Sequence, residues 1–172
     1  MSEPMGAYRS GSSDLYEPMI SLTGLRERVD DDIDPPSVLV ISDCHVGSEV
    51  VTTLDRGTDA CLVTDHDGVA GQTPDDTRVV VGDGRERAVL QDAGAETTDV
   101  ALISMQTDHG AFLVTQLLRT QFDVETVVVV LNDPQHRSAF ESAGSTVICG
   151  SRILATELER AVETTLQTAE IA

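Results

Sequence analysis

Residues 37–47 have the sequence S-V-L-V-I-S-D-C-H-V-G, and the segment V-G-S-E-V-V-T-T-L-D-R continues from Val46. The unbroken apolar run at residues 38–41 predicts a buried strand, and the polar residues after it predict a tight turn. Apolar residues then recur at helical spacing over residues 46–54. This order of strand, turn and helix is typical of the first unit of a nucleotide-binding α/β domain.

The same alternation of strands and helices continues to the end of the chain. Six apolar segments predict strands at residues 38–41, 60–64, 78–81, 100–104, 127–131 and 146–149. Helical spacing predicts helices at about 46–54, 86–93, 111–120, 134–142 and 152–168. The sequence therefore predicts an α/β fold, a doubly wound parallel sheet of about six strands with right-handed crossovers.

Two segments have further expectations. Residues 66–77 contain two glycines and a proline without helical spacing, so this crossover is predicted to be largely irregular. Residues 127–131, V-V-V-V-L, form the most apolar run and are expected to be a central strand, because strands covered on both faces are continuously apolar.

The chain of 172 residues is long enough for one domain with a sizeable core. We expect that domain to span residues 37–168, after a flexible extension at residues 1–36 with a possible short helix over 22–29. The start of the sequence lacks the pattern of a signal peptide, and no run approaches the roughly 20 apolar residues of a membrane span. With three cysteines in or beside apolar runs, we expect a protein of the reducing cytoplasm.

The charge of the chain is strongly negative. Thirty acidic residues stand against eleven basic ones, all arginine, which gives a formal net charge of −19. The lysine-free, carboxylate-rich composition is similar to that of proteins from salt-accumulating halophiles, in which concentrated salt screens the repulsion. A negative surface does not favour nucleic acid or direct membrane insertion, because both kinds of contact use basic or apolar patches.

On a doubly wound sheet a ligand binds at the carboxyl ends of the first and fourth strands, where the strand order reverses. A dinucleotide fingerprint has glycine at three places in the first turn, but here these places hold Ser42, Cys44 and Gly47. The amino terminus of the following helix still offers N–H groups and a positive dipole end to a phosphate. The first turn therefore predicts the place of a phosphate site but not its affinity.

Asp65 follows the second predicted strand, 23 residues after Ser42 (65 minus 42). A carboxylate at about this distance accepts hydrogen bonds from a ribose and favours NAD over NADP, since a 2′-phosphate would meet like charge. An exposed aspartate at the end of a strand is equally typical of so acidic a chain, so both interpretations stay open.

Several segments together resemble one known family. They are L-V-T-D at 62–65, V-V-V-G-D-G at 79–84, A-L-I-S at 101–104, V-V-V-V-L-N-D-P-Q-H at 127–136 and A-G-S-T-V-I-C at 143–149. In this order they resemble the TrkA-N domain, also called the RCK amino-terminal domain, over roughly residues 37–165. The resemblance implies a Rossmann-like fold and a cytoplasmic, non-enzymatic regulator of potassium and other monovalent-cation transport that binds NAD(H) or an adenine nucleotide.

The resemblance also implies roles for particular residues. The loop from Ser42 to Gly47 would face the phosphates, Asp65 the ribose and Asp83 the adenosine, and the segment 106–108 would close over the ligand. The cofactor-binding candidates are Ser42, Asp43, Cys44, His45, Val46, Gly47, Asp65, His66, Gly82, Asp83, Gly84, Gln106, Thr107 and Asp108. The expected partners are a membrane cation transporter or channel subunit and a second copy of the chain in a homo-oligomer. Ala111 or Phe112 stands where the family often has Asn.

Four other interpretations are weighed against this one. The substituted glycine places favour a degenerate module that keeps the fold for interaction and no longer binds a nucleotide. Cys44 beside His45 at a helix amino terminus has the setting of a reactive thiol in a redox sensor or enzyme, although a small side chain filling a glycine position explains it as well. The four histidines have no metal-site spacing, and a dehydrogenase lacks its lysine here, so we predict no metal and no catalytic residue.

Overall fold

The computed structural model describes residues 34–54 and 57–170, with the side chains of residues 169 and 170 left out. The predicted amino-terminal extension lies almost wholly outside the described residues. The described chain forms one α/β unit from Pro35 onward.

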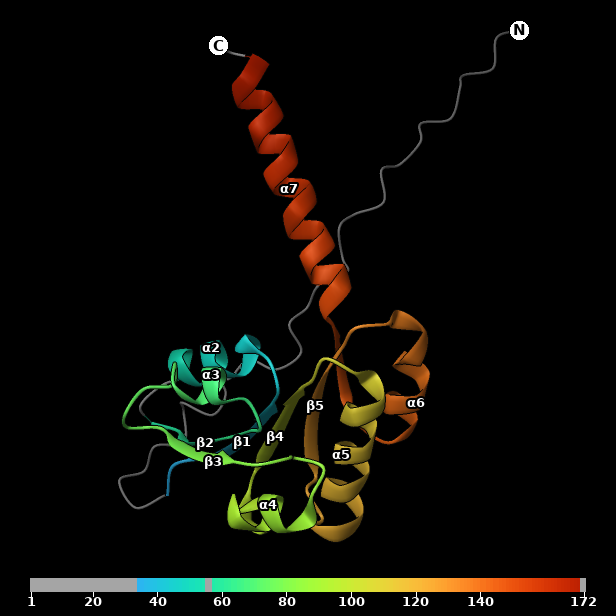
Figure 1. The fold of residues 1–172 in the computed structure, drawn as a ribbon. Helices are drawn as coiled ribbons and strands as arrows, with labels where there is room; N and C mark the ends of the chain where they lie inside the picture. Colours follow the sequence, from blue (N-terminus) through green and yellow to red (C-terminus); the bar gives the residue numbers. More distant parts are fainter. Residues whose placement is uncertain (1–33, 55–56, 171–172) are drawn as a thin grey trace, which may run out of the picture. The chain divides into compact units, whose positions relative to one another are not determined.

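Six parallel strands form one sheet (Figure 1). They are β1 (Ser37–Ser42), β2 (Asp59–Thr64), β3 (Arg78–Val81), β4 (Val100–Ser104), β5 (Thr126–Leu131) and β6 (Thr146–Cys149). Their order is β3-β2-β1-β4-β5-β6, so the direction of winding reverses between β1 and β4. The register pairs Val38 with Val100 and Ser42 with Ser104, which brings the carboxyl ends of β1 and β4 to the same edge. The predicted doubly wound, Rossmann-like sheet is confirmed.

The prediction of a central place for β5 needs correction. β5 is an inner strand, but it lies one place from the edge strand β6, and β1 and β4 form the middle pair. Val127 and Val129 are buried all the same, because α5 and α6 cover that face of β5 and strands flank it on both sides. A continuous apolar run therefore reports burial and not position in the sheet.

Helices cover the two faces of the sheet. On one face lie α2 (His45–Thr53) and α3 (Asp67–Ala70), and on the other lie α4 (Arg87–Asp92), α5 (Asp108–Gln121) and α6 (Arg137–Ser142) (Figure 1). The short 3-10 helices η1 (Ala95–Thr97) and η2 (Pro134–His136) precede β4 and α6. The larger core cluster, with Leu118 and Phe140, lies under α4 to α6, and a smaller one, with Val51 and Val69, lies under α2 and α3.

The crossover at residues 66–77 is largely irregular, as predicted, and contains a single helical turn, α3. Val69 explains it: this side chain is almost completely buried against the smaller core and anchors the turn. A helix of four residues contains too few apolar positions to show helical spacing, so periodicity alone does not reveal it.

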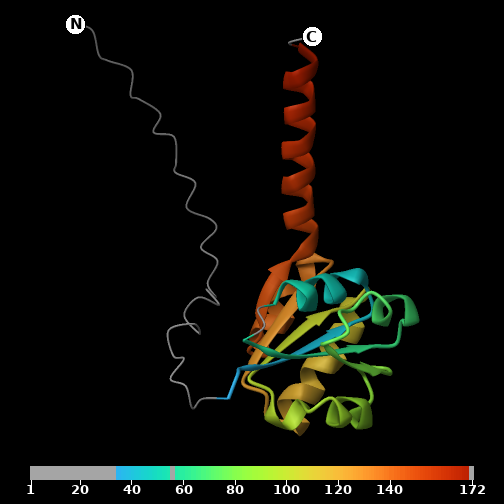
Figure 2. The ribbon, with the colours of Figure 1, turned by 90° about the vertical axis from the view of Figure 1, so that its left-hand side faces the viewer.

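The last helix, α7 (Gly150–Glu170), leaves β6 and projects away from the sheet in both views (Figures 1 and 2). Residues 151–168 are all exposed. Leu154, Leu158, Val162 and Leu166 are 57–61% exposed and recur every fourth residue, so they share one side of the helix. The face of the sheet that carries α2 and α3 also leaves Val130 and Ile148 half-buried, at β5 and β6.

Candidate functional site

The turns at the carboxyl ends of β1, β2, β3 and β4 carry every one of the predicted binding residues. Those residues fall into the β1–α2 turn with the first residues of α2, the β2–α3 turn, the β3–α4 turn and the β4–α5 turn. The prediction that strand ends gather these residues at one edge agrees with the strand order. Which of them contact a ligand stays a prediction.

The β1–α2 turn is held by its own polar groups. Ser42 Oγ donates to the Cys44 carbonyl (3.0 Å) and accepts from the Cys44 N–H (3.3 Å). A Cβ added at Gly47 would lie 2.3 Å from Ser42 Cβ, so the serine at the first fingerprint place makes glycine obligatory at the third. Cys44 is the N-cap of α2 but gives no side-chain capping bond, so no cap side chain occupies the first N–H groups of α2.

Two contacts cross from this turn to the β4–α5 turn. The Gln106 N–H donates to the Asp43 carboxylate (2.8 Å), and the Gln106 side-chain amide donates to the Asp43 carbonyl (3.2 Å). Beneath them, Cys44 Sγ lies 3.6 Å from both oxygens of Ser104. Side chains of this chain therefore bridge the crevice between β1 and β4, directly above the reversal in strand order.

The β3–α4 turn contains an ion pair. Arg85 donates from Nε and Nη2 to the two oxygens of Asp83 at 2.8–3.1 Å, and the Arg85 hydrogen bond lowers the pKa of Asp83. The bond to Asp83 raises the pKa of Arg85, and the charges of Asp65 and Asp43 add a smaller effect in the same direction. A Cβ at Gly84 would lie 2.4 Å from Ile41, so the turn packs closely on β1.

The β2–α3 turn contains Asp65, the predicted ribose contact. Asp65 is exposed, and among residues 34–54 and 57–170 no hydrogen bond to its carboxylate is found. His66 follows as the N-cap of α3, with its backbone N–H donating to Thr64 Oγ1 (3.2 Å). The His66 carbonyl also accepts from the N–H groups of Val69 and Ala70, and the Asp65 carboxylate is exposed.

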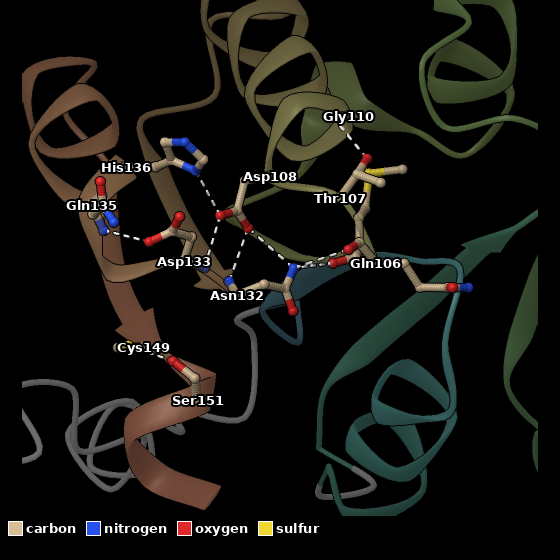
Figure 3. Close-up of polar contacts among 11 residues, drawn as sticks. Gln106, Thr107, Asp108, Gly110, Asn132, Asp133, Gln135, His136, Cys149 and Ser151 are labelled. Atoms are coloured by element: carbon tan, nitrogen blue, oxygen red, sulfur yellow. Dashed lines mark hydrogen bonds and ion pairs between the residues drawn. The ribbon is translucent and has the colours of Figure 1, made fainter. Parts of the chain in front are cut away.

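The Asp108 carboxylate is hydrogen-bonded to groups of the same chain (Figure 3). Its carboxylate accepts from the backbone N–H groups of Asn132 and Asp133 (both 2.9 Å), from Asn132 Nδ2 (3.0 Å) and from His136 Nδ1 (2.8 Å). Burial acts to raise the pKa of Asp108, but these donors together lower it, and the same contact raises the pKa of His136. Thr107 caps α5 by accepting from the Gly110 N–H (3.2 Å).

Sequence reasoning missed three residues of this edge, namely Arg85, Asn132 and His136. Asn132 and His136 were part of the quoted family segment but had no role assigned, although a polar group directly after a buried strand indicates this edge. Arg85 had no such indication beyond its closeness to Asp83. In the described part of the chain, no three His, Cys, Asp or Glu side chains gather to hold a metal ion.

The family model of the TrkA-N domain matches residues 38–150. The chain belongs to the TrkA-N domain family. The match covers the whole sheet and ends at the first residue of α7. No curated protein sequence matches the chain.

Solved structures confirm the fold of this TrkA-N domain. The TrkA-N domain of the inner membrane protein ybaL from Escherichia coli is 16% identical, with a TM-score of 0.64 over 76% of this chain and 98% of that one. The Kef C-terminal domain of Shewanella denitrificans, in its AMP-bound form, is 19% identical, with a TM-score of 0.63 over 76% and 81%. The GsuK channel bound to NAD is 18% identical, with a TM-score of 0.60 over 72% of this chain and 23% of that one.

No helix among the described residues of the TrkA-N domain is long and apolar enough to cross a membrane. Its longest helix, α7, places charged residues between its apolar ones.

Proposed function

We propose that this chain is a non-enzymatic, cytoplasmic regulatory domain that binds NAD(H) or an adenine nucleotide and controls a potassium or other monovalent-cation transport protein. The observation that carries the proposal is the amino terminus of α2, which has no side-chain cap and lies at the reversal in strand order, together with the exposed carboxylate of Asp65 after the neighbouring strand β2. That pair offers N–H donors to a phosphate and an acceptor to a ribose. Structural neighbours named for AMP and for NAD support the ligand class.

The regulatory class is supported by how the polar groups of the edge are used. Asp43 bonds to Gln106, Asp83 to Arg85, and Asp108 to Asn132 and His136. General acid–base catalysis uses a titratable group free to exchange a proton with a substrate. Among the described residues, these three carboxylates instead accept hydrogen bonds from partners within the domain. This arrangement favours a regulatory domain over an enzyme.

A second copy of the chain is the proposed partner of α7. Most of the stability of a helix in a protein comes from the packing of its apolar face, and here the apolar side of α7 is exposed. The half-buried Val130 and Ile148 offer an apolar surface on the sheet. In a homo-oligomer, α7 of one copy packs either on this sheet surface of the second copy or on the second copy's α7. Such an oligomer transmits the effect of ligand binding to a transport protein.

Calorimetric titration of the chain with NADH, NAD, ATP, ADP and AMP in molar KCl tests the ligand. We expect heat of binding with at least one of them, and about tenfold weaker binding after Asp65→Asn, which removes the charge and one of the two acceptor oxygens offered to a ribose. Asp75→Asn is the matched control, because it removes the same charge from an exposed loop before β3. No heat with any nucleotide would remove the ligand from the proposal.

Light scattering after size-exclusion chromatography tests the oligomer. We expect more than one chain per particle and a monomer after Leu158→Glu with Val162→Glu, which charge the apolar side of α7. Gln167→Glu adds charge to the opposite side of the helix and should leave the particle mass unchanged. A monomeric natural chain would refute this part.

A degenerate interaction module is the second candidate, and the side chains of Ser42 and Cys44 in the β1–α2 turn favour it. It predicts no nucleotide binding by the natural chain and new binding after Ser42→Gly with Cys44→Gly. Tight binding by the natural chain would exclude it.

A further inference from the structure

At the reversal in strand order, two hydrogen-bonded residues connect the turns after β1 and β4. We term this pair, Asp43 and Gln106, the clasp. Gln106 donates both of its hydrogen bonds, from the backbone N–H to the Asp43 carboxylate and from the side-chain amide to the Asp43 backbone carbonyl. The clasp joins the turn after β1 to the turn after β4, whose strands lie side by side in the sheet. A dinucleotide on a doubly wound sheet passes over the crevice between these two strands, with one nucleoside on each side.

The two sides of the clasp differ in the groups that they leave for a ligand. On the β1–β3 side, α2 has no side-chain cap and Asp65 has no hydrogen-bond partner among the described residues. On the β4–β6 side, Thr107 caps α5, and the Asp108 carboxylate is filled by four donors from residues 132–136. Among the described residues, the first side thus leaves a helix amino terminus without a side-chain cap and an unbonded carboxylate to a nucleoside and its phosphate, whereas on the second side the equivalent cap and carboxylate are bonded within the domain.

From these two observations we infer that the site takes an adenine mononucleotide on its β1–β3 side and that the Asp43–Gln106 clasp excludes a dinucleotide. The inference rests on the proposed function and selects the ligand class for that site. Asp43 is then a specificity-determining residue. A dinucleotide has to open the clasp and meets a capped helix and a bonded Asp108 carboxylate beyond it, whereas a mononucleotide leaves the clasp in place.

The charge of Asp43 has a separate effect from the clasp. Its carboxylate stands at the turn just before α2, so it repels any phosphate bound to the helix amino terminus. Neutralising Asp43 should therefore strengthen the binding of every nucleotide, whereas opening the clasp should strengthen dinucleotide binding alone. AMP and NADH carry similar charge near neutral pH, so the ratio of their affinities reports the clasp and not the charge.

Calorimetric titration of the full chain with AMP and with NADH, in molar KCl, measures that ratio. We expect the natural chain to bind AMP at least about tenfold more tightly than NADH, since one charge-assisted hydrogen bond has to break for the dinucleotide. Asp43→Asn keeps an acceptor for Gln106 and should tighten both ligands with a small change in the ratio. Asp43→Gly removes the carboxylate bond of the clasp, leaves only the longer bond to the backbone carbonyl, and should bring the ratio to within about threefold. Glu49→Gln, which removes one charge from an exposed position on α2, should leave the ratio unchanged.

Amide hydrogen exchange tests the clasp without any ligand. The Gln106 amide should exchange more slowly in the natural chain than in Asp43→Gly, and Asp43→Asn should lie between them. Equal exchange in all three would overturn the inference.

The affinity data separate two kinds of failure. If the natural chain binds NADH as tightly as AMP, or if Asp43→Gly leaves the ratio unchanged, the inference is wrong while the proposed function stands. If neither the natural chain nor any variant binds a nucleotide, the proposed function fails and the inference fails with it.

Discussion

The two halves of the sheet use the same kinds of residue in opposite ways. In the β1–β3 half, the helix after the first strand has no side-chain cap, and Asp65 projects into solvent. In the β4–β6 half, the helix after the fourth strand is capped by Thr107, and Asp108 is buried under four hydrogen bonds. Of Asp65 and Asp108, only Asp108 is hydrogen-bonded among the described residues, although Asp43 and Asp83 in the first half are also bonded.

This difference shows that residues at the carboxyl ends of the strands can serve either ligand binding or stability. A carboxylate that accepts several donors within the fold lowers the free energy of the folded state and has little left for a ligand. An exposed carboxylate contributes little stability and keeps its acceptors available. The comparison therefore assigns stability to the β4–β6 half and ligand binding to the β1–β3 half, and each assignment can be broken by mutation.

The largest expected effect is the loss of Asp108. Asp108→Ala leaves the N–H groups of Asn132 and Asp133 without their acceptor in a part-buried turn, so we expect a loss of about 3 kcal/mol in the free energy of unfolding. Asp65→Ala is the same substitution in the other half and should change it by less than about 0.5 kcal/mol. Denaturation by urea, with both variants in one buffer, measures the difference.

Comparable losses in the two variants would break the comparison, because Asp65 would then contribute to stability as Asp108 does. Asp108→Asn sharpens it: the amide keeps the size of the side chain and one acceptor, so its loss should fall between those of the natural chain and Asp108→Ala.

The fold was largely accessible from the sequence, because the alternation of apolar runs and helical spacing records burial directly. The ends of the helices were less so. Helical spacing placed the start of α5 at Ala111, but the helix begins at Asp108, since its first turn is polar and is set by the cap at Thr107. The single turn of α3 depends on one buried side chain, Val69, which no periodicity can show.

The site was accessible in part. The strand order requires that the turns meet, so the right turns could be chosen from the sequence. The pairing of side chains across them could not, because Asp43 and Gln106 are 63 residues apart and Asp108 and Asn132 are 24 apart. No local rule tells which donor an aspartate will meet, so Asp108 was expected to close over a ligand with Gln106, whereas its carboxylate is turned to residues 132–136.

A smaller effect is expected at the helix cap of the β4–β6 half. Thr107→Ala removes the acceptor of the Gly110 N–H and should cost about 1 kcal/mol of unfolding free energy. Thr107→Ser keeps the hydroxyl and should cost less than about half of that. Thermal unfolding of both variants measures these losses. Equal losses would show that Thr107 acts through packing and not as a cap.

The smallest effect is the pH dependence contributed by His136. Its hydrogen bond to Asp108 raises the pKa of His136 in the folded state above its unfolded value, so the stabilisation is complete below about pH 6.5 and is lost as the pH rises through the folded pKa. Asp108 does not titrate in that range, because its pKa is lowered.

His136→Gln can still donate to the carboxylate but carries no charge, so its stability relative to the natural chain should improve between about pH 6 and about pH 9. The effect is small because the imidazole is 55% exposed, and His109→Gln, an exposed position on α5, is the control that should show no trend. Melting curves of His136→Gln and the natural chain that stay parallel over this range would show that the contact with Asp108 does not depend on the charge of His136, and that the β4–β6 half is stabilised by its backbone donors alone.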